Sequence, residues 1–481
     1  MHFLDAVESR EPYTRQMSSA RTKALSGWMA MLTTLSLVAC GSSQDPAGDD
    51  PLGLPGDAAD PTRLGADGAA EGGTPVAPRG ARIEHVVVIM QENHTFDTYF
   101  GRWCKAAPGS NPSCTKGQEC CEAAPDREPS GAAPIELTDE ANAAYDPDHS
   151  QPCEVAEMNG GKMDRFVKGA SCSNAKNFAI SPAAVVAPYH DYAAKYAIGD
   201  RYFQSIIGQT SANDMYFAVA KKVFTDNAFI PNAIGQGCSN PLTPKMRNTS
   251  ESTIADILIN HGERVRFYAE GYDVMRSSGS CPPHPPDCRG ANPVFASYPC
   301  AYDPSDIPFN YYQQFTDNPA FLMDWSQFDK DLGAGDLAEV SYIKPIGYHT
   351  EHPGYGTSIS VGVAWVEAAI SKILASPYAK NTLVLLTWDE GGGYYDHVGP
   401  PNTPSPIDQE RVGTRVPIFA IGRFAKKNYV SHVVMEHSSI VKFLEWNFIG
   451  KTGQLQTRDT LANNIGSLIE PAETLVPVPE Q

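Results

Sequence analysis

The sequence is poor in charged residues and poorer still in positive ones. Asp, Glu, Lys and Arg make up 19% of the 481 residues, below the usual quarter. The 56 acidic residues outnumber the 37 basic ones, which gives a formal charge of −19. Because a phosphate backbone attracts basic surfaces, this balance argues against nucleic acid as the main partner. It gives no support either for docking on an anionic lipid surface.

The N-terminal apolar run Trp28–Ala39 is too short to span a membrane comfortably. It follows Arg21 and Lys23 and ends on small residues, a pattern typical of a secretory signal. Its end, LVAC, resembles a bacterial lipobox, in which Cys40 would become the lipidated first residue. We therefore expect residues 1–39 to be a signal peptide and the mature chain to be a cell-envelope lipoprotein, at the outer membrane or cell surface. An ordinary signal peptide with a chance cysteine is the alternative.

Cysteine is absent from the C-terminal third of the chain. Without Cys40 ten cysteines remain, and they lie in two Pro- and Gly-rich stretches, 102–177 and 235–305. An even number in an exported chain predicts disulfides that staple loop insertions, although the pairing does not follow from the sequence. A zinc site is a weaker interpretation, because Cys120 and Cys121 are adjacent and no paired histidines follow.

The rest of the pattern favours one α/β domain behind a tether. Residues 40–81 are rich in Gly, Ala, Pro and Asp and have almost no large apolar side chains, which predicts a flexible segment. The domain then covers residues 82–481, in which we find no internal repeat. In its last third we expect a helix, two strands and a helix, at 358–374, 382–387, 416–421 and 440–448. Alternation of this kind predicts a mostly parallel sheet with helices on both faces.

Two apolar runs lead directly to oxygen-bearing side chains. IEHVVVIM leads to Glu92 and Asn93, and LVLL leads to Asp389 and Glu390, which precede three glycines. In α/β enzymes the carboxyl ends of parallel strands are the usual place for a site. Four oxygen donors predict a divalent cation, with Ca, Mg or Mn favoured over Zn and the identity left open. The alternative is that each acid caps a loop or pairs with an arginine.

The segment GQTSAN, residues 208–213, precedes a helix-like run and carries two hydroxyl residues. A helix N-terminus offers N–H donors that suit an anion. A hydroxyl beside a cation can ionise and act as a nucleophile. An ordinary polar helix cap is the alternative interpretation.

Taken in order, these segments resemble the bacterial phosphoesterase family that holds non-haemolytic-type phospholipases C and respiratory-burst-inhibiting acid phosphatases. The resemblance covers nearly the whole chain from Arg82 and is carried by IEHVVVIMQENHTFDTYFG, NGGKMDRF, GQTSAN, TEHPGYG, TWDEGGGYYDHVGPP, GTRVPIFAIG and HVVMEHSSIVKFLE. It implies an alkaline-phosphatase-like α/β fold and one divalent metal ion. The residues that match the family's metal ligands are Glu92, Asn93, Asp389 and Glu390.

The same resemblance implies that Thr210 is the nucleophile, with its oxygen near the metal and Ser211 as the one-residue alternative. The family's histidines contact the phosphoryl group or protonate the leaving alcohol, and they match His352, His397 and, less securely, His149. Asn213 and Asn93 are the substrate-binding candidates. The chain departs from the family pattern in having Ala212 where proline is usual, and Asp306 where a histidine segment is usual.

We therefore expect an exported, metal-dependent hydrolase of phosphoric esters that works through a phosphothreonine intermediate. Its substrate would be a phospholipid, as for a phospholipase C, or a small phosphomonoester, as for an acid phosphatase. A glycoside hydrolase would need its two carboxylates on opposite sides of a sugar, which adjacent acids fit less well. A sulfatase would need a Cys-x-Pro-x-Arg motif, which the sequence lacks. A tethered, non-catalytic surface protein on a phosphoesterase scaffold is the last alternative.

Overall fold

The computed structural model describes residues 83–239, 242–246, 250–285, 288, 290 and 297–481. All of them belong to one compact unit, Gly73–Gln481. The predicted signal peptide, the tether and the lipidated Cys40 lie outside the described residues. Each helix within the described part is too short or too polar to cross a lipid bilayer.

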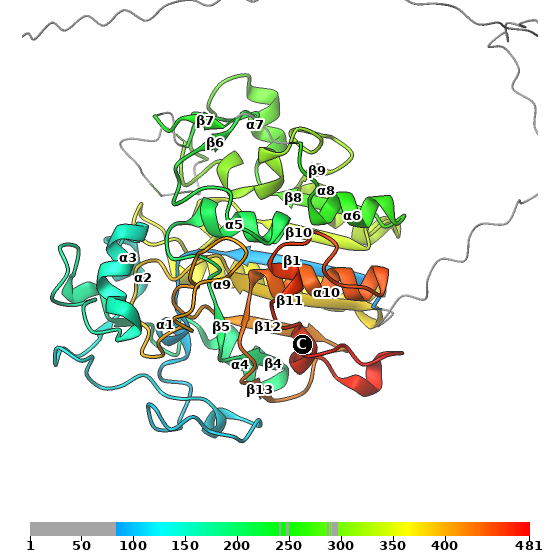
Figure 1. The fold of residues 1–481 in the computed structure, drawn as a ribbon. Coiled ribbons are helices and arrows are strands. Elements are labelled where there is room, and N and C mark those ends of the chain that lie inside the picture. Colours follow the sequence, from blue (N-terminus) through cyan, green and yellow to red (C-terminus); the bar gives the residue numbers. More distant parts are fainter. Residues whose placement is uncertain (1–82, 240–241, 247–249, 286–287, 289, 291–296) are drawn as a thin grey trace, which may run out of the picture. The chain divides into compact units, whose positions relative to one another are not determined.

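A large mixed sheet forms the centre of this unit (Figure 1). Within the described residues it has eight strands, in the spatial order β13 (Tyr429–Ser431), β4 (Ala197–Gly199), β12 (Ile418–Gly422), β11 (Thr382–Trp388), β1 (His85–Gln91), β10 (Val340–Lys344), β8 (Val265–Ala269) and β9 (Leu322–Asp324). Every neighbouring pair is parallel except the two that β12 makes with β11 and β4. The predicted mostly parallel α/β sheet is therefore confirmed.

The two strands predicted to carry the site lie next to each other at the middle of the sheet. β1 and β11 pair in parallel over their full length, and β10 flanks β1 on its other side. All seven residues of each of these two strands are buried. A parallel strand that is covered on both faces needs apolar side chains in both directions, which explains the unbroken runs of Val, Ile and Leu.

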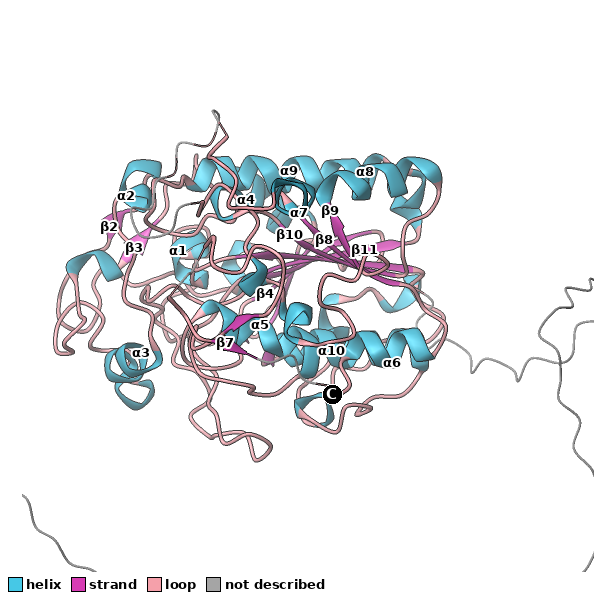
Figure 2. Cartoon of the chain, turned by 90° about the horizontal axis from the view of Figure 1, so that it is seen from above, coloured by secondary structure: helices cyan, strands magenta, loops and turns pink. Residues whose placement is uncertain are grey.

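Helices cover both faces of the sheet (Figure 2). One face carries α4 (Ala187–Lys195), α8 (Trp325–Ala334) and α9 (Ile359–Ala375), and the other carries α5 (Thr210–Val219), α6 (Ile254–Asn260) and α10 (His437–Ile449). The spacing of apolar residues predicted α9 within one residue at each end, and Pro377 follows where the helix ends. The last predicted helix is α10, which begins three residues earlier than expected, under the side-chain cap of Glu436.

Shorter elements and disulfides hold the insertions together. The remaining helices are α1 (Phe96–Phe100), α2 (Asp139–Ala143), α3 (Gln151–Met158) and α7 (Tyr272–Ser278). The remaining strands pair as β2 (Ile135–Glu136) with β3 (Ala179–Ile180), β5 (Tyr202–Phe203) with β14 (Met435–Glu436), and β6 (Ile230–Pro231) with β7 (Lys245–Met246). The ten cysteines form the pairs 104–121, 114–120, 153–172, 238–281 and 288–300. Every pair closes within one of the two predicted insertions, so the expectation of disulfide-stapled loops is confirmed.

Candidate active site

The carboxyl ends of β1 and β11 bring the predicted metal ligands together. The last residues of the two strands lie opposite each other, so the turns that follow them start side by side. Across this junction the backbone N–H of Asn93 donates to Oδ1 of Asp389 at 3.0 Å, although the two residues are 296 positions apart. Glu92, Asn93, Asp389 and Glu390 are at most 1% exposed. Four oxygen-bearing side chains therefore share one buried edge of the sheet.

Besides Oε1 of Glu92, which lies 2.8 Å from Nζ of Lys344, three oxygens in this group have no hydrogen-bond partner in the described structure. They are Oδ1 of Asn93, Oδ2 of Asp389 and Oε1 of Glu390, and all three are buried. Buried polar atoms are almost always satisfied, so three unsatisfied acceptors in one place fit a cation. Burial raises the pKa of Asp389 to about 6 and the pKa of Glu390 well above its usual value. A divalent cation would offset that desolvation, and the donors present fit such an ion.

Tight turns fix the positions of these oxygens. Asn93 adopts a left-handed conformation with φ 62°, which asparagine tolerates better than most residues. Gly392 has φ +66°, and a Cβ there would lie 2.1 Å from the carbonyl oxygen of Asn93. Only glycine lets the two turns approach this closely. Nε2 of His437 donates to the carbonyl oxygen of Asp389 at 2.6 Å. Burial lowers the pKa of His437 to about 3, which keeps the ring neutral.

Thr210 lines the same pocket as Glu92, one of the predicted metal ligands. It is the first residue of α5 and is 4% exposed. It lines an open pocket together with Glu92 and His352, and Ser211 lines that pocket too. A hydroxyl, a carboxylate and an imidazole thus border one space that solvent can enter. Such a space can admit a substrate.

The turn before Thr210 is held from two directions. Within the turn, the Asn213 side chain accepts a hydrogen bond from the backbone N–H of Ile206 at 3.0 Å and donates to the carbonyl oxygen of Gly208 at 2.9 Å. These bonds make Asn213 an organiser of the turn, and its expected role in substrate binding stays a prediction. Gln204 links this turn to the loop that follows β11 and carries Asp389 and Glu390. Its Oε1 accepts a hydrogen bond from the N–H of Gly391 at 2.9 Å, and its Nε2 donates to the carbonyl oxygen of Gly208 at 3.4 Å.

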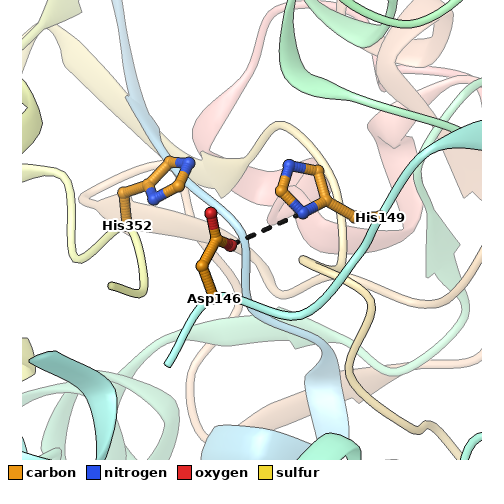
Figure 3. Close-up of side chains that lie close together, drawn as sticks. All are labelled: Asp146, His149 and His352. Carbon is orange, nitrogen blue, oxygen red and sulfur yellow. Dashed lines mark ion pairs between the residues drawn. The ribbon is translucent and has the colours of Figure 1, made fainter. Parts of the chain in front are cut away.

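Two of the three predicted histidines lie at this site. Figure 3 shows His149 and His352 on either side of Asp146, and ligand atoms of the three residues lie within 4.8 Å of one another. Nδ1 of each ring is 2.7 Å from a nearby backbone carbonyl oxygen, to which it donates. The Nε2 atom of each ring takes no part in this bond, and Nε2 of His149 lies 3.4 Å from Nδ2 of Asn93. Nε2 of His149 is 3.8 Å from Oε1 of Glu390, which ties this cluster to the metal ligands.

His397 lies elsewhere, in a buried ion network. Its Nδ1 is 2.8 Å from Oδ2 of Asp97, and its Nε2 is 3.3 Å from Oε2 of Glu122. Burial lowers the pKa of His397, but Asp97 and Glu122 outweigh burial and raise it to about 9. The pocket that Thr210 lines does not include His397. The structure therefore unites the predicted site residues except His397, whose catalytic role stays a prediction.

Several charged residues beside the site had no role predicted from the sequence, and of these only Asp306 was noted there, in place of the family's histidine segment. Lys344 ends β10, and its Nζ is 2.8 Å from Oε1 of Glu92. Asp303 and Asp306 line the pocket, and Asp214 is fully buried on α5 with both carboxylate oxygens lacking a hydrogen-bond partner. The strand-end argument that found Glu92 applies equally to Lys344, because β10 is parallel to β1 and adjacent to it. No local pattern marks Asp214 or Asp303.

Comparison with known proteins identifies the family of this chain. The model of the Phosphoesterase family matches residues 83–449, which is more than half of the chain. The chain belongs to the phosphoesterase family.

Its relatives include phospholipases C. The chain is 24% identical over 410 residues to the hemolytic phospholipase C of Pseudomonas aeruginosa, covering 76% of this chain and 53% of that one. It is 23% identical over 415 residues to phospholipase C B of Mycobacterium tuberculosis, with 76% and 73% covered. It is also 23% identical over 424 residues to non-specific phospholipase C6 of Arabidopsis thaliana, with 79% and 71% covered. The chain thus spans about half the length of the Pseudomonas relative.

Similar solved structures include a protein of the alkaline phosphatase superfamily from Vibrio parahaemolyticus. That structure has a TM-score of 0.32 and 12% identity, and the match covers 57% of this chain and 64% of that one. The lipoteichoic acid synthase LtaP from Listeria monocytogenes has a TM-score of 0.33 and 9% identity, with 79% and 74% covered.

Proposed function

We propose that this phosphoesterase-family member is a divalent-metal-dependent hydrolase of phosphoric esters with Thr210 as its nucleophile. The observation that carries the proposal is the convergence of Thr210 and Glu92 on one pocket, beside three buried oxygens without partners. The family membership and the phospholipase C relatives support the same reaction class. Glu92, Asn93, Asp389 and Glu390 would hold the ion.

The residues can divide the reaction into two steps. A bound divalent ion would supply positive charge at the phosphoryl oxygens and favour the ionised threonine. In the first step Thr210 gives its proton to Nε2 of His352, its Oγ1 bonds to phosphorus, and the bond between phosphorus and the leaving alcohol breaks. His352, which lines the pocket, passes that proton to the leaving alcohol. In the second step water gives one proton to Nε2 of His352, and its oxygen bonds to phosphorus. The bond from phosphorus to Oγ1 then breaks, and Thr210 takes that proton back from His352.

The charge of the pocket favours a phosphodiester over a phosphomonoester. Glu92, Asp303 and Asp306 line it, and the aromatic rings of Tyr298 and Tyr355 stand beside them. Like charges repel, so acidic walls disfavour the dianion of a monoester more than the monoanion of a diester. The names of the phospholipase C relatives agree with a diester substrate. A phospholipid is therefore the proposed substrate, and a small phosphomonoester is the alternative.

Export and lipidation at Cys40 belong to the same proposal. Five disulfides support an oxidising compartment, because such bonds rarely persist in a reducing cytosol. A lipid on Cys40 would keep the enzyme at the bacterial envelope, beside phospholipid. Mass spectrometry of the intact protein from membranes would detect the acyl chains, and an unmodified Cys40 would contradict the anchor.

One experiment tests the reaction class, the metal and the substrate. The purified protein is assayed on p-nitrophenylphosphorylcholine and on p-nitrophenyl phosphate, with and without EDTA. We expect turnover of the diester to exceed turnover of the monoester, and both to be lost with EDTA and restored by a divalent ion. Turnover that EDTA leaves unchanged would contradict the metal, and a strong monoester preference would contradict the substrate.

Substitutions in the nucleophile turn test the role of Thr210. Thr210→Ala removes the attacking oxygen, so turnover should fall by at least about a thousandfold. Thr210→Ser keeps an oxygen at nearly the same place and should retain measurable activity. The matched control is Ser211→Ala, which removes the neighbouring hydroxyl of the same pocket. An active Thr210→Ala protein with an inactive Ser211→Ala protein would move the nucleophile to Ser211.

A further inference from the structure

A buried lysine contacts one of the predicted metal ligands. Lys344 is 2% exposed, and its Nζ is 2.8 Å from Oε1 of Glu92. The other buried lysine in the described residues, Lys442 on α10, donates instead to the backbone carbonyl oxygen of Ala462 at 2.7 Å. Burying an ammonium group is unfavourable unless opposite charges compensate it. The surroundings of Lys344 supply that compensation.

Carboxylates surround Lys344. The groups that act on it electrostatically are Glu92, Asp214, Asp306 and Asp389, in decreasing order. Glu92 is in direct contact, with its Oε1 2.8 Å from Nζ of Lys344. Asp214 is fully buried and neither of its oxygens has a hydrogen-bond partner, so its interaction with Lys344 is one of charge rather than of hydrogen bonding. The ammonium group of Lys344 therefore lies inside an acidic cluster.

The sum of the charges shows how Lys344 can affect the binding of one metal ion. The carboxylates among the proposed ligands are Glu92, Asp389 and Glu390, which carry a charge of −3 when ionised. With Lys344 the sum over the ligands becomes −3 + 1 = −2, which equals in size the charge of one divalent ion. Asp214 and Asp306 are not ligands and are present with or without Lys344, so they do not change the difference that the lysine makes. Without Lys344 the same ligands would hold the ion more tightly and would leave it with less positive charge toward a substrate.

We propose that Lys344 is a positioning residue whose charge holds Glu92 and limits the affinity of the site for its divalent ion. The inference rests on the proposed metal-dependent function and deepens it. Because Lys344 pairs with one carboxylate oxygen of Glu92, that oxygen donates less charge to the ion. The ion stays more electron-poor and acts more strongly on the phosphoryl group.

Metal titration tests the proposal without any substrate. Chelator-treated wild-type protein, Lys344→Met and the control Lys442→Met are titrated with Mn²⁺, and in parallel with Ca²⁺, by calorimetry at pH 7.5. The expected result is that Lys344→Met binds the ion about tenfold or more tightly than wild type, while its turnover falls by about tenfold. Lys442→Met should match wild type in affinity, because no metal ligand contacts Lys442.

The sign of the affinity change separates this role from a purely structural one. A lysine that only supported the fold would, on removal, loosen the ligands, so both metal affinity and turnover would fall together. Equal or weaker binding by Lys344→Met therefore overturns the proposal. If wild-type protein bound neither ion, the proposed metal-dependent function itself would fail, which is a different outcome from the failure of the lysine inference.

A paired substitution keeps the test open if Lys344→Met does not fold. Near-UV circular dichroism reports whether it does. Glu92→Gln together with Lys344→Met removes both charges of the pair and leaves no unpaired buried ion. This double variant should bind Mn²⁺ more tightly than Glu92→Gln alone, in which the charge of Lys344 remains. Equal or weaker binding by the double variant would also overturn the proposal.

Discussion

The buried carboxyl group of Glu351 should make the stability of this protein depend on pH near neutrality. Glu351 is fully buried, next in sequence to His352, and has φ 73°. Four side chains donate hydrogen bonds to it: Tyr99 at 2.5 Å, Gln91 at 3.1 Å, Trp388 at 3.3 Å, and Tyr189. Burial raises its pKa from 4.5 to about 7, against the effect of these donors. Desolvation of the carboxylate therefore outweighs its hydrogen bonds.

The raised pKa fixes the sign and the size of the effect. Between the two values the folded state binds more protons than the unfolded state, so the free energy of unfolding falls as pH rises. The contribution of Glu351 is fully present below pH 4.5 and is lost as pH rises through about 7. The pKa of Glu351 in the folded state exceeds its usual value by 7 − 4.5 = 2.5. At 1.36 kcal/mol for each pKa unit, ionisation of Glu351 lowers the free energy of unfolding by at most about 3 kcal/mol.

The measurement compares wild type with Glu351→Gln, which cannot ionise. Urea unfolding of chelator-treated protein with intact disulfides is followed at half-unit steps from pH 4.5 to pH 8.5. Burial also raises the pKa of Glu157 and Glu445 to about 8, so only the difference between the two proteins isolates Glu351. We expect Glu351→Gln to gain stability relative to wild type as pH rises. Two curves that stay parallel over this range would refute the reasoning.

Two further predictions concern residues that organise the site. His397→Gln removes the charged partner of Asp97, so the free energy of unfolding at pH 7 should fall by about 2–3 kcal/mol. The loss should be smaller above pH 9, because the pKa of His397 is raised to about 9 and its stabilising charge is lost as pH rises through that value. Urea unfolding at pH 7 and pH 10 measures both losses, and equal losses would contradict the prediction. Gln204→Ala removes the hydrogen bonds that connect Gly391 to Gly208. Turnover should therefore fall about tenfold, while Mn²⁺ affinity changes by less than about threefold. Unchanged turnover would show that the connection between the two turns does not matter for catalysis.

The sequence was most informative where a local pattern specifies a local structure. The unbroken apolar run of β1 and the helical spacing of α9 predicted both elements to within two residues at each end. Strand direction was not visible in the same way, because the apolar run of β12 fits either direction and only its neighbours make it antiparallel. The helix-like run predicted at 215–223 is α5, which begins five residues earlier and ends at Val219. The early start was missed because the polar residues from Thr210 onward lack an apolar period and are buried by tertiary packing.

By itself, the sequence determined that two buried strands end on paired oxygen donors, that ten cysteines lie in two insertions, and that the segment GQTSAN leads into a helix. These facts follow from composition and periodicity along the chain. The tertiary structure alone decided which cysteines pair, that His352 and not His397 reaches the pocket of Thr210, and that Lys344 lies against Glu92. Such contacts depend on strand order and on how loops fold over the sheet edge, and these bring together charges that are hundreds of residues apart.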